Sequence, residues 1–96
     1  MVRRIVSISG ILLSQAGTFS QRVESALTNL DIQLHDFLER RDSGEDPFRK
    51  EMIISYFEIR GSFKFCYQCG YITRDEFRKL MKRLNGKTYE EKEMRR

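Results

Sequence analysis

The chain has 96 residues, of which 40% are hydrophobic and 33% are charged, so it fits one small domain with a well-solvated surface. No stretch approaches the roughly 20 consecutive apolar residues that a membrane-spanning helix needs. Two cysteines only three positions apart exclude a disulfide framework. The net charge of +4 is too small to establish nucleic-acid binding on its own.

Charge is unevenly distributed along the chain. Residues 18–47 hold three basic and seven acidic side chains, whereas residues 48–96 hold thirteen basic and seven acidic ones. This polarity suits antiparallel contacts between copies of the chain, or a basic face for an anionic partner.

Residues 1–14 are rich in β-branched side chains, and their conformation stays open between a short helix and a strand. Two arginines ahead of the apolar run from Ile5 to Leu13 give the start a faint likeness to a secretory signal peptide. Two serines and a glycine interrupt that run, so a cytoplasmic protein is the expectation.

The first predicted helix covers residues 18–42. Thr18 and Gln21 have the spacing of a capping box, and one apolar stripe follows at three- and four-residue steps. The stripe comprises Phe19, Val23, Ala26, Leu27, Leu30, Leu34, Phe37 and Leu38. The sequence Ser43-Gly44-Glu45 breaks the pattern and ends the helix.

The second predicted helix covers residues 47–69. Asp46 and Pro47 suit its N-cap and first helical position, because proline loses nothing where the backbone N–H has no partner. One sector about 100° wide holds its main apolar residues: Phe48, Met52, Tyr56, Ile59, Phe63, Cys66 and Tyr67. Four further apolar residues lie outside that sector: Ile53, Ile54, Phe57 and Phe65. This helix is therefore expected either to be central, with two neighbours, or to meet a second copy of the chain. A kink or a close backbone contact would explain Gly61.

The third predicted helix is short, at residues 74–84. Gly70 suits the left-handed residue that ends the preceding helix, and Thr73 with Glu76 forms a second capping box. The apolar side of the short helix carries Phe77, Leu80, Met81 and Leu84, and its other side carries Arg74, Arg78, Lys79, Lys82 and Arg83. Asn85-Gly86 ends it, so residues 1–86 are predicted to form one domain and residues 87–96 a charged, fraying tail.

These elements predict an all-α fold, a small helical bundle in which an antiparallel hairpin of helices 18–42 and 47–69 carries the short helix 74–84. The short helix cannot cover both longer ones. The uncovered apolar surface must therefore meet residues 1–14, a second subunit or a partner. The prediction is a homodimer formed through the central helix, with Ile53 and Phe57 nearest the partner subunit.

Cys66 and Cys69 are the one pair in the chain with metal-ligand spacing. The string Cys66-x-x-Cys69-Gly70-x-Ile72-Thr73-x-x-Glu76, followed by Leu80, resembles the zinc hook of the double-strand-break repair ATPases, in which a Cys-x-x-Cys turn joins two coiled-coil arms. The resemblance covers about fifteen residues and implies zinc-bridged dimerisation only. Structural thiols are the favoured interpretation, because Cys66 lies at the edge of the apolar sector. A redox role is disfavoured because the pair closes a helix, where the helix dipole has the wrong sign.

The five cations of helix 74–84 form a face that suits phosphate contacts. Helix-turn-helix proteins place a short second helix in the major groove of DNA. A solvated face with an ion pair between Asp75 and Lys79 is the simpler interpretation of the same residues.

Groups for catalysis are scarce in this sequence: the single histidine, His35, has no paired nucleophile, and no glycine-rich phosphate loop occurs. The sequence therefore predicts a non-enzymatic regulatory or adaptor protein with no cofactor, which acts through protein–protein contacts as a helical homodimer away from membranes. One alternative is a DNA-binding dimer that uses residues 73–87. The other is a zinc-bridged dimerisation module through Cys66 and Cys69.

Overall fold

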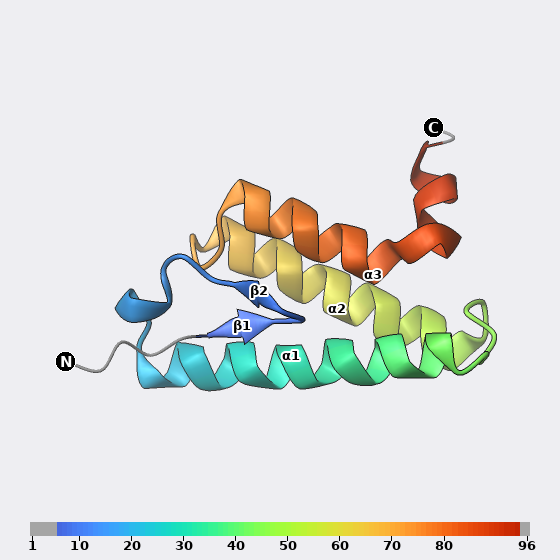
Figure 1. Ribbon diagram of the computed structural model, residues 1–96, viewed down its shortest axis with the longest axis horizontal. Helices are drawn as coiled ribbons and strands as arrows, with labels where there is room; N and C mark the ends of the chain where they lie inside the picture. The colour runs from blue at the N-terminus through green and yellow to red at the C-terminus, as the bar shows by residue number, and fades with distance from the viewer. Residues whose placement is uncertain (1–5, 95–96) are drawn as a thin grey trace.

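The structure, a computed structural model, describes residues 6–94 and the side chains of residues 6–86 except Ala16. Its elements are β1 (Ser7–Ile8), β2 (Ile11–Leu12), a 3-10 turn η1 (Ala16–Thr18), α1 (Gln21–Asp42), α2 (Lys50–Gln68) and α3 (Arg74–Met94). The helices α1 and α2 form an antiparallel hairpin, α3 packs on α2, and the two short strands lie between α1 and α3 (Figure 1). The expected helical bundle is thus confirmed, with a small antiparallel sheet added to it.

The segment left open between helix and strand is a β-hairpin. Ser7 pairs with Leu12 and Ile8 with Ile11, and the two turn residues, Ser9 and Gly10, have positive φ angles of 52° and 81°. A two-residue turn of this kind matches the twist of the flanking strands. The hairpin covers part of the apolar surface of the helices, because Val6, Ile8 and Leu13 are buried in the common core.

The N-cap of α1 lies two residues after the expected cap at Thr18. Ser20 is the N-cap, and its hydroxyl oxygen accepts a hydrogen bond from the backbone N–H of Val23 at 3.3 Å. The capping box predicted at Thr18 is wrong, since the Thr18 hydroxyl instead donates to the carbonyl of Gln15 within the 3-10 turn. The predicted stripe forms the buried face, at Leu27, Leu30, Leu34 and Phe37.

Helix α2 begins at Lys50, and the N-cap predicted at Asp46 is also wrong. The Asp46 carboxylate accepts a hydrogen bond from the backbone N–H of Phe48 at 2.9 Å, and the Asp46 carbonyl accepts one from Arg49 at 3.1 Å. Asp46 and Pro47 therefore close a turn before the helix starts. Arg49 occupies the cap position without a side-chain capping bond.

The turn from α2 to α3 follows the prediction. Gly70 has a φ of 78°, the N–H of Tyr71 donates to the carbonyl of Cys66, and the N–H of Gly70 donates to that of Tyr67. This pair of bonds is a Schellman motif. The second capping box is confirmed as well: Thr73 N–H donates to Glu76 at 2.8 Å, and Glu76 N–H donates to the Thr73 hydroxyl at 3.2 Å.

Helix α3 is interrupted at Gly86, whose φ of 53° and ψ of −158° are not helical. The Arg41 guanidinium of α1 reaches this point and donates to the carbonyls of Leu84 at 2.7 Å and Arg83 at 3.3 Å. The predicted end of the short helix at residues 85–86 thus coincides with this break, and the backbone is helical again up to Met94. The side chains of the predicted tail 87–96, and residues 95–96 entirely, lie outside the described part.

Helix α2 is central, as predicted. It contacts α1 on one side and α3 on the other, and its buried residues are Met52, Tyr56, Ile59, Phe63 and Cys66. The Tyr56 hydroxyl donates to the side-chain carbonyl of Asn85 at 2.5 Å within the core. This bond fixes the first half of α2 against the last turn of α3 before its break.

Across the described residues, every helix is too short or too polar to cross a membrane.

Candidate functional site

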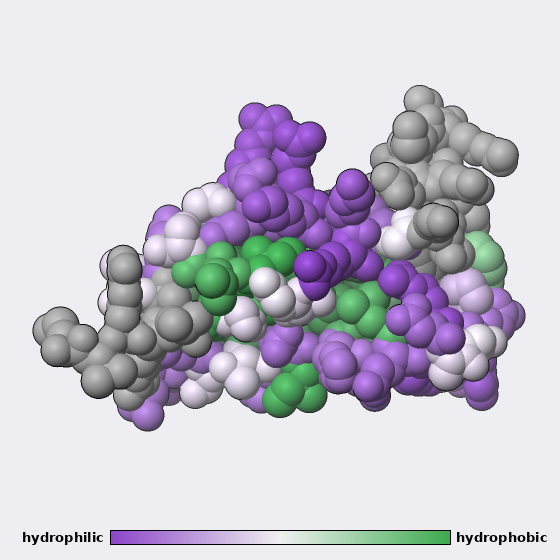
Figure 2. All heavy atoms as spheres, viewed as in Figure 1, coloured by the Kyte–Doolittle hydropathy of each residue, from purple (hydrophilic) through white to green (hydrophobic). Residues whose placement is uncertain are grey.

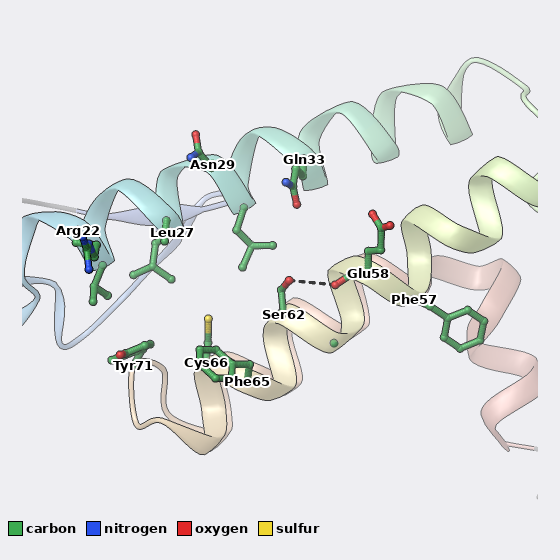
Figure 3. Close-up of a pocket in the computed structure, with 14 residues that line it drawn as sticks. Arg22, Leu27, Asn29, Gln33, Phe57, Glu58, Ser62, Phe65, Cys66 and Tyr71 are labelled. Carbon is green, nitrogen blue, oxygen red and sulfur yellow. Dashed lines mark hydrogen bonds between the residues drawn. The ribbon is translucent and has the colours of Figure 1, made fainter.

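An apolar groove of about 590 Å³ runs between α1 and α2. Figure 3 shows Leu27 and Gln33 of α1 pointing toward α2, while Ser62 and Cys66 point back toward α1. Gly61 contributes no side chain to the α2 side of the groove, and a Cβ added there would meet no described atom within 4 Å. Among the described residues, the expected close backbone contact at Gly61 is therefore absent, and the glycine lies exposed on the surface of α2.

An exposed stripe on α2 lies beside this groove, and we define it as Ile54, Phe57, Gly61 and Phe65. The last three of these residues line the groove. Ile54, Phe57 and Phe65 leave 46%, 56% and 60% of their surface exposed. The three- and four-residue spacing places the stripe on the side of α2 opposite its buried residues. Large apolar side chains exposed together in this way mark contact sites.

Of the two residues predicted nearest a partner subunit, Phe57 belongs to the stripe and points away from α1 (Figure 3). Ile53 lies half-buried on the flank of α2. Neither is enclosed in the core, so the homodimer interface stays a prediction with Phe57 as its better-placed member.

The basic residues of α3 form a second surface. Arg74, Arg78, Lys79, Lys82 and Arg83 are all exposed, and hydrophilic side chains gather over α3 in Figure 2. The Lys79 ammonium lies 3.1 Å from the Asp75 carboxylate, and Arg83 donates to the Ser9 hydroxyl at 3.0 Å. The opposite side of the helix packs on the core through Leu80 and Leu84, with Phe77 and Met81 half-buried beside them.

The two cysteines lie in different environments. Cys66 is 7% exposed and lines the groove, whereas Cys69 is exposed at the end of α2. Burial, with a smaller effect from the Cys69 thiol, raises the pKa of the Cys66 thiol. A zinc site shared between two subunits would require Cys66 to leave the core. Among the described side chains, no three His, Cys, Asp or Glu residues are grouped to hold a metal ion.

The single histidine lies on the surface. His35 is exposed, and its Nε2 atom is 3.1 Å from the Glu39 carboxylate one helical turn away.

Two long-range hydrogen bonds to carboxylates were not predicted from the sequence. Glu76 is 6% exposed, and its second carboxylate oxygen accepts a hydrogen bond from the backbone N–H of Ser14 at 2.7 Å. The Asp31 carboxylate of α1 accepts one from the backbone N–H of Ser9 at 2.6 Å. Both carboxylates hold the β-hairpin segment on the helices, and sequence spacings of 62 and 22 residues gave no local signal for them.

No known protein family, curated protein or solved structure matches this chain. The stripe on α2 and the basic face of α3 are the candidate interaction surfaces of the described residues.

Proposed function

We propose that this protein is a non-enzymatic regulatory or adaptor protein, which works as a homodimer and offers the basic face of α3 to a protein partner. The observation that carries the proposal is the division of α3 into two sides. Its apolar side is packed in the core at Leu80 and Leu84, while its five cations are exposed. Exposed charges contribute little to folding, so a surface role accounts for them better than a structural one.

The stripe on α2 supports the homodimer. Three large apolar side chains project from one face of a central helix beside an open apolar groove. A second copy that covered them would remove apolar surface from water at about 25 cal/mol per Å². We also propose a cytoplasmic location, because two cysteines three positions apart provide no disulfide framework of the kind that secreted domains use.

The basic face can be tested by changing one charge at a time. A photo-crosslinking residue in place of Arg78 of the full chain would capture the partner bound to the basic face. Lys82→Glu should reduce the amount of partner captured. Lys50→Glu, an exposed Lys→Glu change at the start of α2, is the matched control and should leave capture intact. Equal capture by both variants would overturn the proposed role of α3.

DNA binding is the second candidate, favoured by the same row of cations along α3. Contacts to phosphates release counterions, so affinity for duplex DNA should then fall by about 10³-fold or more between 50 and 200 mM salt if six or more phosphates are contacted. Titration of labelled duplex DNA at the two salt concentrations distinguishes the candidates. The absence of binding at 50 mM salt would favour the protein adaptor.

A further inference from the structure

The middle of α2 carries matching aromatic residues and opposite charges at equal distances from Gly61. The sequence from residue 57 to residue 65 is Phe-Glu-Ile-Arg-Gly-Ser-Phe-Lys-Phe. Phenylalanine stands four positions before and four positions after the glycine. A negative charge, Glu58, stands three positions before it, and a positive charge, Lys64, stands three positions after it.

These residues face solvent together. Phe57 and Phe65 are the two most exposed aromatic side chains of α2, and Glu58, Gly61 and Lys64 are exposed as well. An exposed glycine in mid-helix costs about 1 kcal/mol relative to alanine, and no described residue would lie within 4 Å of a Cβ added there. A close approach by a neighbouring helix is a reason for a glycine at that place.

A two-fold symmetric interface brings the same patch of each subunit together, so the patch must complement itself. If two α2 helices cross antiparallel at Gly61, each residue before the glycine lies at the same height along the helix axis as the partner subunit's residue equally far after it. Phe57 then lies level with the partner subunit's Phe65, and Glu58 lies level with the partner subunit's Lys64. A parallel pair would instead bring like charges to the same level.

We propose that two copies of the chain pair through α2, antiparallel about a two-fold axis at Gly61, with the aromatic side chains of the stripe covering the groove of the other copy. This pairing rests on the proposed homodimer and defines its interface. Gly61 lets the helices approach closely, and Phe57 and Phe65 supply the apolar contact on both sides of the crossing. The charges at Glu58 and Lys64 select the antiparallel direction.

A disulfide placed on the axis tests the pairing. In a Cys69→Ser background, Gly61→Cys puts two thiols at the crossing point, within the Cα separation of about 4.4–6.8 Å that a disulfide needs. Mild oxidation should then give a reducible covalent dimer. The matched variant Lys64→Cys should give none, because the two copies of that residue would lie about 9 Å apart along the helix axis.

Affinity measurements by analytical ultracentrifugation give a second readout. Phe57→Ala and Phe65→Ala should each weaken dimerisation by about tenfold or more, as expected for central aromatic residues. The control Ile32→Ala removes an equally exposed apolar side chain, 61% exposed, from α1 outside the groove, and it should leave the affinity unchanged. Glu58→Lys should weaken it about fivefold, and the double variant Glu58→Lys/Lys64→Glu should restore it, because exposed ion pairs contribute a few tenths to one kcal/mol each.

The outcomes separate this pairing from the wider proposal. A dimer that forms without the Gly61→Cys cross-link, or that tolerates both phenylalanine changes, would overturn the pairing and leave the homodimer standing. A wild-type protein that stays monomeric at hundreds of micromolar would overturn both. Circular dichroism of each variant confirms that folding is intact, since all the substituted residues are exposed.

Discussion

Two cysteines that lie only three residues apart differ in burial. Cys66 is in the core and Cys69 is in solvent, so Cys66→Ser should cost about 1 kcal/mol or more, because a hydroxyl without a partner is costly to bury. Cys69→Ser should leave the free energy of unfolding unchanged. Urea denaturation of both variants measures the difference, and equal losses accompanied by a loss of bound zinc would contradict the structural role of Cys66.

Because the Cys66 thiol is buried, the free energy of unfolding should fall at alkaline pH. Burial raises the pKa of this thiol in the folded state, so the unfolded chain loses the proton first as pH rises. The contribution of Cys66 is fully present below about pH 8.5, the ordinary thiol pKa, and declines as pH rises through the folded value. The check is the free energy of unfolding between pH 7.5 and 10, which should fall less steeply in Cys66→Ala.

Glu76 links the β-hairpin segment to the start of α3 by hydrogen bonds to both. Its two oxygens accept hydrogen bonds from Thr73 and Ser14, whereas the amide of glutamine has a single oxygen. Glu76→Gln should therefore leave one N–H poorly satisfied and cost about 1–3 kcal/mol. Asp75→Asn, an exposed neighbour that loses the same charge, should cost only a few tenths of a kcal/mol, and equal melting temperatures for the two variants would refute this role.

At the scale of elements, the spacing of apolar residues predicted that the helices exist, but the capping residues did not always predict where each helix begins. The capping box at Thr73 was confirmed because both of its hydrogen bonds form between residues three apart. Asp46 has the same cap chemistry, but its carboxylate bonds to Phe48 two residues on and makes a turn instead. The Ser9-Gly10 turn between β-branched residues was the available signal for the hairpin. The ties from Asp31 and Glu76 lie far apart in sequence, so only the fold brings them together.

Gly61 and Gly70 allow a test in which only the backbone conformation differs. An added Cβ meets no atom within 4 Å at either position, but Gly70 has a φ of 78° and Gly61 lies within regular helix α2. Gly61→Ala should stabilise the fold by about 0.5–1 kcal/mol at low protein concentration. Gly70→Ala should destabilise it by about 1–2 kcal/mol, because a Cβ is strained in the left-handed region. Thermal unfolding of dilute samples compares the two, and a shift of the same sign in both would contradict the assignment.

At the scale of the whole molecule, one side of α3 is buried in the core and the other carries exposed cations, for which we propose a role in recognition. The buried side closes the core against α2, and the basic side adds positive charge to the surface over the second half of the chain. Lys79 and Arg83 have contacts within the chain, to Asp75 and Ser9. Arg78 and Lys82 are therefore the better pair for a charge reversal that leaves those contacts in place.

The double variant Arg78→Glu/Lys82→Glu should leave the melting temperature almost unchanged, since exposed charges contribute a few tenths of a kcal/mol. It should weaken partner binding most at low salt, because the screening length grows from about 8 Å at physiological salt to about 30 Å at 0.01 M. Leu80→Ala should do the reverse and cost about 2–5 kcal/mol of stability, because Leu80 is fully buried. Calorimetry and a binding titration at two salt concentrations measure both effects. If the double charge reversal unfolds the protein, the basic side is part of the fold, and its assignment as the recognition surface is wrong.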